Sequence, residues 1–181
     1  VKLPMPENAS LKSDAEILKE RAEILAKQTS EPDKKSAIET VTFFLAEEIY
    51  GIELRFVREV LPLGPITFIP GLPAFIPGII HVRGEILSIM DLKRLFELKP
   101  SERAENAYAL ILSAKDMAFG VLADRIIGVK EIPADLPHTS VPTLTGVRAA
   151  YLKGIDASGT IVLDGEKLLT DDALVIDQTA E

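Results

Sequence analysis

Short apolar runs separated by polar or glycine-containing turns cover most of the chain after residue 40. Apolar runs of this length, bounded by turn residues, predict β-strands. The predicted strands are Val41–Leu45, Tyr50–Ile52, Val57–Val60, Gly78–Val82, Ile86–Met90, Tyr108–Leu112, Phe119–Val121, Val129–Ile132, Ala150–Ile155 and Thr160–Leu163. The sequence therefore predicts a mainly β fold.

The most informative stretch runs from Ile66 to Phe96, because it sets one charged hairpin tip between two strongly apolar segments. Three prolines leave room for no more than one short helical turn, at Pro73–Phe75, before the tip; they are Pro70, Pro73 and Pro77. Arg83-Gly84 suits a tight turn, because glycine accepts the positive φ that such turns require. Asp91 is then predicted to cap a short helix over Leu92–Phe96.

One phrase of this pattern occurs twice. Val41–Leu45, a turn and Tyr50–Ile52 reappear as Tyr108–Leu112, a turn and Phe119–Val121. The two copies continue similarly, into Val57-Arg58-Glu59-Val60 and Val129-Lys130-Glu131-Ile132. An internal duplication of this kind predicts two paired small barrels. Neither copy alone would bury much apolar area, so we expect a hydrophobic core shared between them.

The N-terminal region has a different, helical period. Five residues recur at spacings of four and three and form one seam of a helix over residues 9–29: Leu11, Ala15, Leu18, Ala22 and Leu25. Either Ser10 or Ser13 would serve as its N-cap. The helix either docks on its own domain or pairs with another helix.

A linker over Thr29–Ala37 would follow that helix, which divides the chain into an extension (1–36) and a β domain (37–181). Short helices at Glu166–Leu169 and Asp172–Ile176 are expected to finish the β domain.

Composition limits the class of protein. The chain has 181 residues, of which 47% are hydrophobic, and no cysteine. Its apolar runs are shorter than the roughly 20 residues of a membrane span, and its first residues carry no apolar core of a secretory signal. We therefore expect a cytoplasmic protein without direct membrane insertion. The net charge of −8 opposes nucleic-acid binding, which needs clustered Lys and Arg.

Candidate chemistry is sparse. His81 and His138 stand next to no recognisable nucleophile, and each is expected to be a satisfied structural histidine. The sequence contains no phosphate-binding glycine loop, no His-Glu-x-x-His helix and no nucleophile elbow. We therefore expect neither a catalytic site nor a metal or cofactor. Apolar positions beside glycine and proline turns favour a protein-binding module instead.

Several of these motifs together resemble the chemotaxis coupling protein family, CheW, from about residue 40 to 177. They are Tyr50-Gly51-Ile52, Val57–Val60, Pro73–Gly78, His81-Val82-Arg83-Gly84-Glu85-Ile86, Met90-Asp91-Leu92, Phe119-Gly120-Val121 with Asp124, and Tyr151–Gly154. The family often has Asn-Leu-Arg-Gly where this chain has His81-Val82-Arg83-Gly84, which leaves the arginine intact. The N-terminal helix is absent from the shortest members.

The resemblance implies two SH3-like five-stranded barrels sharing a core. It also implies a non-enzymatic adaptor that joins chemoreceptor cytoplasmic tips to the regulatory domain of a CheA-type histidine kinase, recruited to receptor arrays. The implied receptor-binding residues are Val57, Glu59, Val60, Val82, Arg83, Gly84 and Val121, with Glu59 facing Arg83. The implied kinase-binding residues are Pro77, Gly78 and Leu92. The alternative is a double barrel that binds a small ligand, or acts as an enzyme, in the crevice between its halves.

Overall fold

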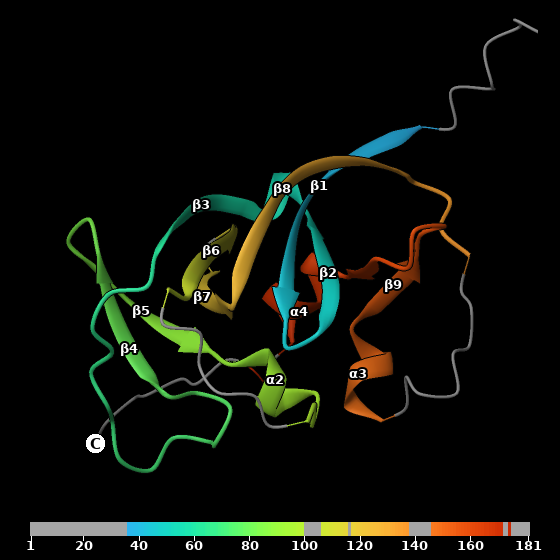
Figure 1. Cartoon of the computed structure of the whole chain (residues 1–181). Coiled ribbons are helices and arrows are strands. Elements are labelled where there is room, and N and C mark those ends of the chain that lie inside the picture. Colours follow the sequence, from blue (N-terminus) through green and yellow to red (C-terminus); the bar gives the residue numbers. More distant parts are fainter. Residues whose placement is uncertain (1–35, 100–105, 116, 138–145, 172–173, 175–181) are drawn as a thin grey trace, which may run out of the picture. The chain divides into compact units, whose positions relative to one another are not determined.

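A computed structural model describes residues 36–99, 106–115, 117–137, 146–171 and 174 (Figure 1). The predicted N-terminal helix, its linker, His138 and the helix predicted over Asp172–Ile176 lie outside these residues or largely so. The described residues form ten strands: β1 (Ala37–Leu45), β2 (Glu48–Glu53), β3 (Val57–Pro62), β4 (Gly78–Val82), β5 (Glu85–Met90), β6 (Tyr108–Ala114), β7 (Met117–Ala123), β8 (Arg125–Pro133), β9 (Leu152–Ile155) and β10 (Ile161–Leu163).

The helices among the described residues are all short. They are the 3₁₀ turn η1 (Leu54–Phe56) and the α-helices α2 (Leu92–Leu95), α3 (Val147–Ala150) and α4 (Gly165–Thr170). None of them has the length and apolar composition of a membrane span. The mainly β prediction is confirmed for this part of the chain.

The ten strands form two five-stranded sheets. Sheet A has the order β8-β1-β2-β10-β9, and sheet B has the order β3-β6-β7-β5-β4. Most pairs are antiparallel, but β10 runs parallel to β2 and β5 runs parallel to β7. The two sheets therefore have the same plan, in which a central hairpin is flanked by one strand on one side and a second hairpin on the other.

The duplication exchanges strands between the sheets. The hairpin β1–β2 comes from the first copy, yet it pairs with β8 and β10 of the second copy. The hairpin β6–β7 of the second copy likewise pairs with β3 and β5 of the first. The equivalent turns within the two hairpins also match, because Ala46 and Lys115 both have φ of +54°. Each sheet is thus built from strands of both copies.

The register corrects how the two copies align at their third strands. Val60 on β3 lies opposite Leu110, and Val129 on β8 lies opposite Val41, at equivalent places in the two sheets. Both strands have a bulge just before these residues, within Val57–Glu59 and at Ile126–Gly128. Val60 is therefore structurally equivalent to Val129, whereas aligning the two similar sequences had paired Val57 with Val129.

Most predicted strands are confirmed with boundaries extended by a few residues, and Gly78–Val82 agrees at both ends. Asp91 caps α2 through a bond from the Lys93 amide (3.0 Å), as predicted. The segment at Pro73 is the single turn that was predicted, closed by Ile76 N–H bonding the Pro73 carbonyl at 2.8 Å. One detail was wrong: Ala150 and Tyr151 belong to α3 and the turn after it, so β9 begins at Leu152.

A shared core joins the two sheets, as predicted. One cluster of buried side chains takes residues from both: Val41, Phe43, Tyr50 and Ile52 from sheet A and Leu110, Leu112, Phe119 and Val121 from sheet B. Its aromatic rings follow one another from Phe43 to Tyr50, Phe96 and Tyr151, at centroid distances of 6.2–6.4 Å. The other face of sheet B has its own apolar cluster, called below the inner cluster of sheet B, which includes Ile80, Leu87, Ile89 and Ile111. Because β6 and β7 are covered on both faces, they read as almost continuous apolar runs.

Each sheet curls so far that its edges approach. In sheet B the segment after β3 bridges to β4 through Thr67 N–H to Ile79 O (2.8 Å) and Ile79 N–H to Thr67 O (3.0 Å). In sheet A, Lys130 of β8 bonds Asp156 after β9 at 2.7 Å. The two edges of each sheet are therefore held together by polar contacts.

The contact that closes sheet A predicts a pH dependence. Burial raises the pKa of Asp156, but hydrogen bonds from Lys130, Ser158 and the Thr160 amide outweigh it and lower that pKa from 3.8 to about 2. The Asp156 carboxylate therefore stabilises the fold fully above pH 3.8, and this contribution is lost as the pH falls toward 2.

We expect Asp156→Asn to unfold at lower urea concentration than the unmodified protein at pH 7. The difference between the two should shrink when the titration is repeated between pH 4 and pH 2. A difference that stays constant over this range would show that Asp156 acts without its charge.

Candidate functional site

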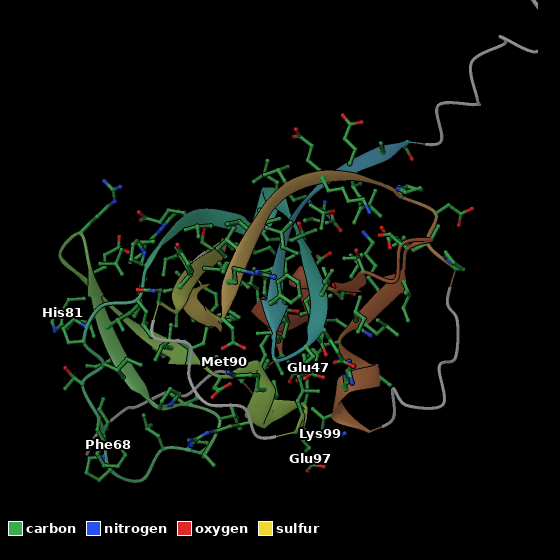
Figure 2. All side chains as sticks on the ribbon, viewed as in Figure 1. Glu47, Phe68, His81, Met90, Glu97 and Lys99 are labelled. Atoms are coloured by element: carbon green, nitrogen blue, oxygen red, sulfur yellow. The ribbon has the colours of Figure 1, made fainter. Side chains whose placement is uncertain are left out.

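The described residues hold no evident reactive centre. No group of three His, Asp or Glu side chains among them lies close enough to hold a metal ion. His81 is exposed on β4 (Figure 2), which corrects the expectation of a satisfied structural histidine. Its neighbours Ile80 and Val82 alternate inward, so the strand period places the imidazole in solvent.

A cluster of exposed charged residues joins β3 to the β4–β5 hairpin. Arg83 Nε donates to both Glu59 oxygens, at 3.0 and 3.3 Å. Arg58 Nη1 donates to Glu85 at 2.8 Å, and Arg58 Nε lies 3.9 Å from Glu59. The Arg83 side chain is 80% exposed, whereas Glu59 is 20% exposed. The facing pair expected from the resemblance, Glu59 and Arg83, is thus formed.

The hairpin tip holds this arrangement in place. Arg83 and Gly84 have φ of +49° and +87°, the backbone of a two-residue turn that matches the twist of its strands. Val82 and Glu85 close the turn as the last pair of the β4–β5 ladder. The guanidinium therefore projects from a short, regular hairpin, and its ion pair is a contact on the rim of sheet B.

Exposed apolar side chains occur at equivalent places on β3 and β8. Val60 is 38% exposed, and its equivalent Val129 is 56% exposed, with Ile127 beside it at 51%. Ile127 and Val129 are two exposed apolar side chains on one strand, and grouped apolar side chains on a surface mark candidate protein-binding positions. The sequence did not identify Ile127 and Val129 as candidate binding residues. The signal was present in the run Ile126-Ile127-Gly128-Val129, but only the bulge reveals which of its side chains face solvent.

The other receptor-binding residues expected from the resemblance do not gather at one opening. Val57 is half-buried, Val82 is 4% exposed within the inner cluster of sheet B, and Val121 is fully buried in the shared core. Val82 and Val121 therefore line no accessible crevice with Val57 and Val60. Each faces the interior because its strand is covered on that side.

The expected kinase-binding residues are also mostly internal. Leu92 is fully buried, Gly78 is buried, and Pro77 is half-buried. The exposed surface next to them belongs to the loop between β3 and β4. Its Phe68 is 73% exposed, and Figure 2 shows this ring projecting from the loop.

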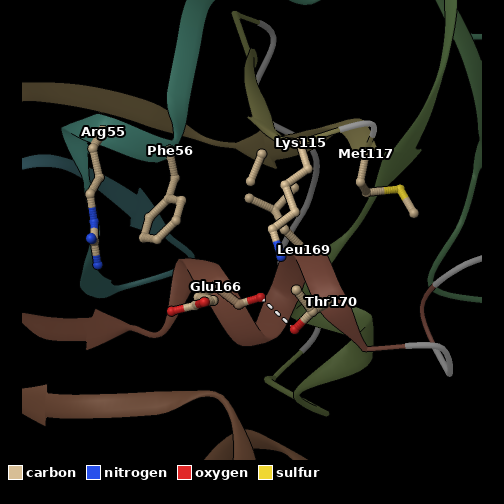
Figure 3. A pocket seen from close by; sticks show the side chains of 8 residues that line it. Arg55, Phe56, Lys115, Met117, Glu166, Leu169 and Thr170 are labelled. Carbon is tan, nitrogen blue, oxygen red and sulfur yellow. Dashed lines mark hydrogen bonds between the residues drawn. The ribbon is translucent and has the colours of Figure 1, made fainter.

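A hollow of about 410 Å³ lies between η1, the β6–β7 turn and α4 (Figure 3). Phe56, Met117 and Leu169 give it an apolar lining, and Arg55, Lys115 and Glu166 stand at its side. Arg55 is already engaged, because its Nε lies 2.7 Å from Glu53 and its guanidinium lies over the Phe56 ring. A second hollow of about 630 Å³ adjoins Lys115 and Met117 and includes the Arg58–Glu85 pair. These hollows are better suited to receive side chains of a partner protein than to catalyse a reaction.

Comparison with known proteins gives one consistent result. A family model described as "CheW-like domain" matches residues 39–173. The chemotaxis protein CheW of Treponema pallidum is 33% identical over 141 residues, covering 74% of this chain and 83% of that protein. Protein FrzA of Myxococcus xanthus is 35% identical over 112 residues, covering 60% and 68%. The crystal structure of the scaffolding protein TtCheW from Thermoanaerobacter tengcongensis has a TM-score of 0.61 at 30% identity, covering 70% of this chain and 82% of that one.

Proposed function

This chain belongs to the CheW-like domain family and is an adaptor of chemotaxis signalling, and we propose that it joins the cytoplasmic tip of a chemoreceptor to the regulatory domain of a CheA-type histidine kinase. The family match across residues 39–173 is the observation that carries this proposal. We assign the chain no catalytic activity and no cofactor. Its place of action would be the cytoplasm, at receptor arrays.

The proposed receptor-binding face lies on β3 and the β4–β5 hairpin. It would include the exposed Arg83–Glu59 pair, Gly84 of the turn, and the apolar Val57 and Val60 of β3. Ile127 and Val129 would add a second apolar strand surface on β8. An amphipathic helix docks by placing an apolar stripe against such positions while its polar flanks meet charged side chains. Val82 and Val121 would support this face from within.

The proposed kinase-binding face lies elsewhere on sheet B, near Pro77, Gly78 and Leu92. We propose that each curled sheet is an SH3-like barrel and that sheet B meets a barrel of the kinase regulatory domain. Two separate faces would allow one copy of the chain to hold both partners. The N-terminal helix predicted for residues 9–29 would be an extension of this adaptor.

The alternative, a small-ligand-binding or enzymatic double barrel, is not favoured. The family match and the scaffolding-protein structure both point to an adaptor. The hollow beside η1 does bring Arg55, Lys115 and Glu166 near one another, but Arg55 is paired with Glu53.

Simultaneous binding is the test of this proposal. We expect each partner alone to bind with a dissociation constant in the micromolar range, about −8 kcal/mol. Immobilised receptor tip should retain the kinase regulatory domain only when this chain is added, because the chain alone bridges the two. Retention should rise with the amount of chain and then fall when excess chain occupies each partner separately. Competition between receptor tip and kinase domain for the chain would contradict two-faced bridging.

A further inference from the structure

The segment between Glu59 and Arg83 contains no Asp, Glu, Lys or Arg, although such residues make up 27% of the chain. Much of this segment is the loop from Leu63 to Pro77, which leaves β3 and returns to β4. A loop on a protein surface is ordinarily polar, and protein interfaces are depleted of charge at their centres and enriched in aromatic residues. The composition of this loop is that of an interface centre.

The loop is held by contacts at both ends. At its start Thr67 exchanges two backbone hydrogen bonds with Ile79, and Ile66 packs on the inner cluster of sheet B. At its end the Asp91 amide bonds the Phe75 carbonyl at 2.7 Å, and Arg94 Nη1 bonds the Ala74 carbonyl at 3.0 Å. Four prolines fix further backbone angles. Because the loop is already ordered, a partner would meet little entropic cost in binding it.

Phe68 is the most exposed large hydrophobic side chain among the described residues, at 73%. It stands next to Thr67, so its backbone lies on the bridge to β4, while Ile69 and Leu72 are half-exposed further along the loop. Phenylalanine is enriched at interface centres, and a support that is already ordered lowers the entropic cost of placing the ring there.

We propose that Phe68 is the apolar anchor by which this chain docks on the kinase regulatory domain, inserting its ring into an apolar recess of that domain's barrel; this rests on the proposed adaptor function. Three arguments favour this partner. The loop continues directly into Pro77 and Gly78, on the face proposed for the kinase. Arg83 of the receptor face follows Val82 at one end of β4, whereas the loop joins β4 at its other end, at Gly78. An anionic membrane would require basic residues, which this segment lacks.

The affinities of the adaptor for its two partners should depend differently on salt concentration. Binding to the kinase regulatory domain through Phe68 should change little between low and high salt, because no charge lies in the loop. Binding to the receptor tip through Arg83 should weaken as salt rises.

The experiment compares Phe68→Ala and Phe68→Glu with the unmodified full-length chain by titration calorimetry against the isolated kinase regulatory domain. We expect about 30-fold weaker binding for Phe68→Ala and more for Phe68→Glu. Receptor-tip affinity and melting temperature should be unchanged, since the ring is exposed. Ile86→Ala is the matched control, because Ile86 is 61% exposed on β5 of the same sheet but outside the charge-free segment. It should bind the kinase domain normally.

Kinase-domain affinity retained in both Phe68 variants would overturn this inference while leaving the adaptor function intact. Failure of the unmodified chain to bind any kinase regulatory domain would instead overturn the proposed function. Loss of chain self-association, seen by sedimentation, with unchanged kinase binding would assign Phe68 to a contact between copies of this chain. Loss of binding to vesicles, again with unchanged kinase binding, would assign it to a membrane; either result would overturn the inference.

Discussion

Replacing Arg83 by Glu is expected to abolish binding of the receptor tip and to leave the melting temperature within a few degrees of the unmodified value. The Arg83 side chain is 80% exposed, and an ion pair with this much solvent contributes about 0 to 1 kcal/mol to folding. The same substitution reverses a charge on the proposed receptor face and places two carboxylates together at Glu59. Binding should therefore suffer far more than stability.

Arg94→Glu is the matched control for this prediction. Arg94 is 62% exposed, lies 3.6 Å from Asp91 and bonds the Ala74 carbonyl of the β3–β4 loop, so it lies outside the proposed receptor face while the change in net charge is the same. Receptor-tip affinity, measured by titration of each variant, should be normal for Arg94→Glu and undetectable for Arg83→Glu. An Arg83→Glu chain that unfolds would mean that the hairpin tip is a structural element, and equal losses in both variants would point to net charge alone.

The sequence predicted local structure correctly where a few neighbouring residues determine it. The Arg83-Gly84 turn, the Asp91 cap and the strand Gly78–Val82 each depend on a few consecutive residues, and all three are confirmed. The duplication was also visible, since it repeats a phrase of apolar and glycine residues. The coarse fold followed from these signals.

The strand exchange could not be predicted in the same way. Whether β3 pairs with β2 or with β6 depends on contacts between residues far apart in the chain, and the alternation of Val57–Val60 is compatible with either. The bulges within β3 and β8 then shift the register and decide that Val60 and Val129 are equivalent. Sequence similarity at these strands was misleading for that reason.

The candidate site residues also divide into those that the sequence predicted and those whose exposure depends on long-range packing. Glu59 and Arg83 were found because the family resemblance carries that pair. Val82 and Val121 belong to strands whose apolar residues pack on both faces, and alternation alone does not say which apolar side chains remain open. Phe68, Ile127 and Val129 lie at a loop and at a bulge, where the strand period gives no direction for a side chain.

Gly78 illustrates why a residue predicted for binding can be essential for folding instead. It starts β4 at φ of +149°, a conformation that residues with a Cβ rarely adopt. A Cβ at this position would lie 2.2 Å from the Thr67 carbonyl oxygen. That oxygen accepts the Ile79 amide and so closes sheet B, which means that it has no room to move without breaking the closure.

Gly78→Ala is therefore expected to lower the free energy of unfolding by about 3 kcal/mol or more, from backbone strain and the clash together. For a chain of this length the melting temperature should fall by roughly 6–12 °C. Gly159→Ala separates the two causes, because Gly159 has φ of +84° with open space where a Cβ would stand. Strain alone should cost it about 1 kcal/mol. Calorimetric melting of both variants checks this ordering, and equal losses would show that the Thr67 contact yields. Any loss of kinase binding in Gly78→Ala should then be proportional to the fraction of the variant that is unfolded. At a temperature where the variant is fully folded, it should bind the kinase domain as well as the unmodified chain does.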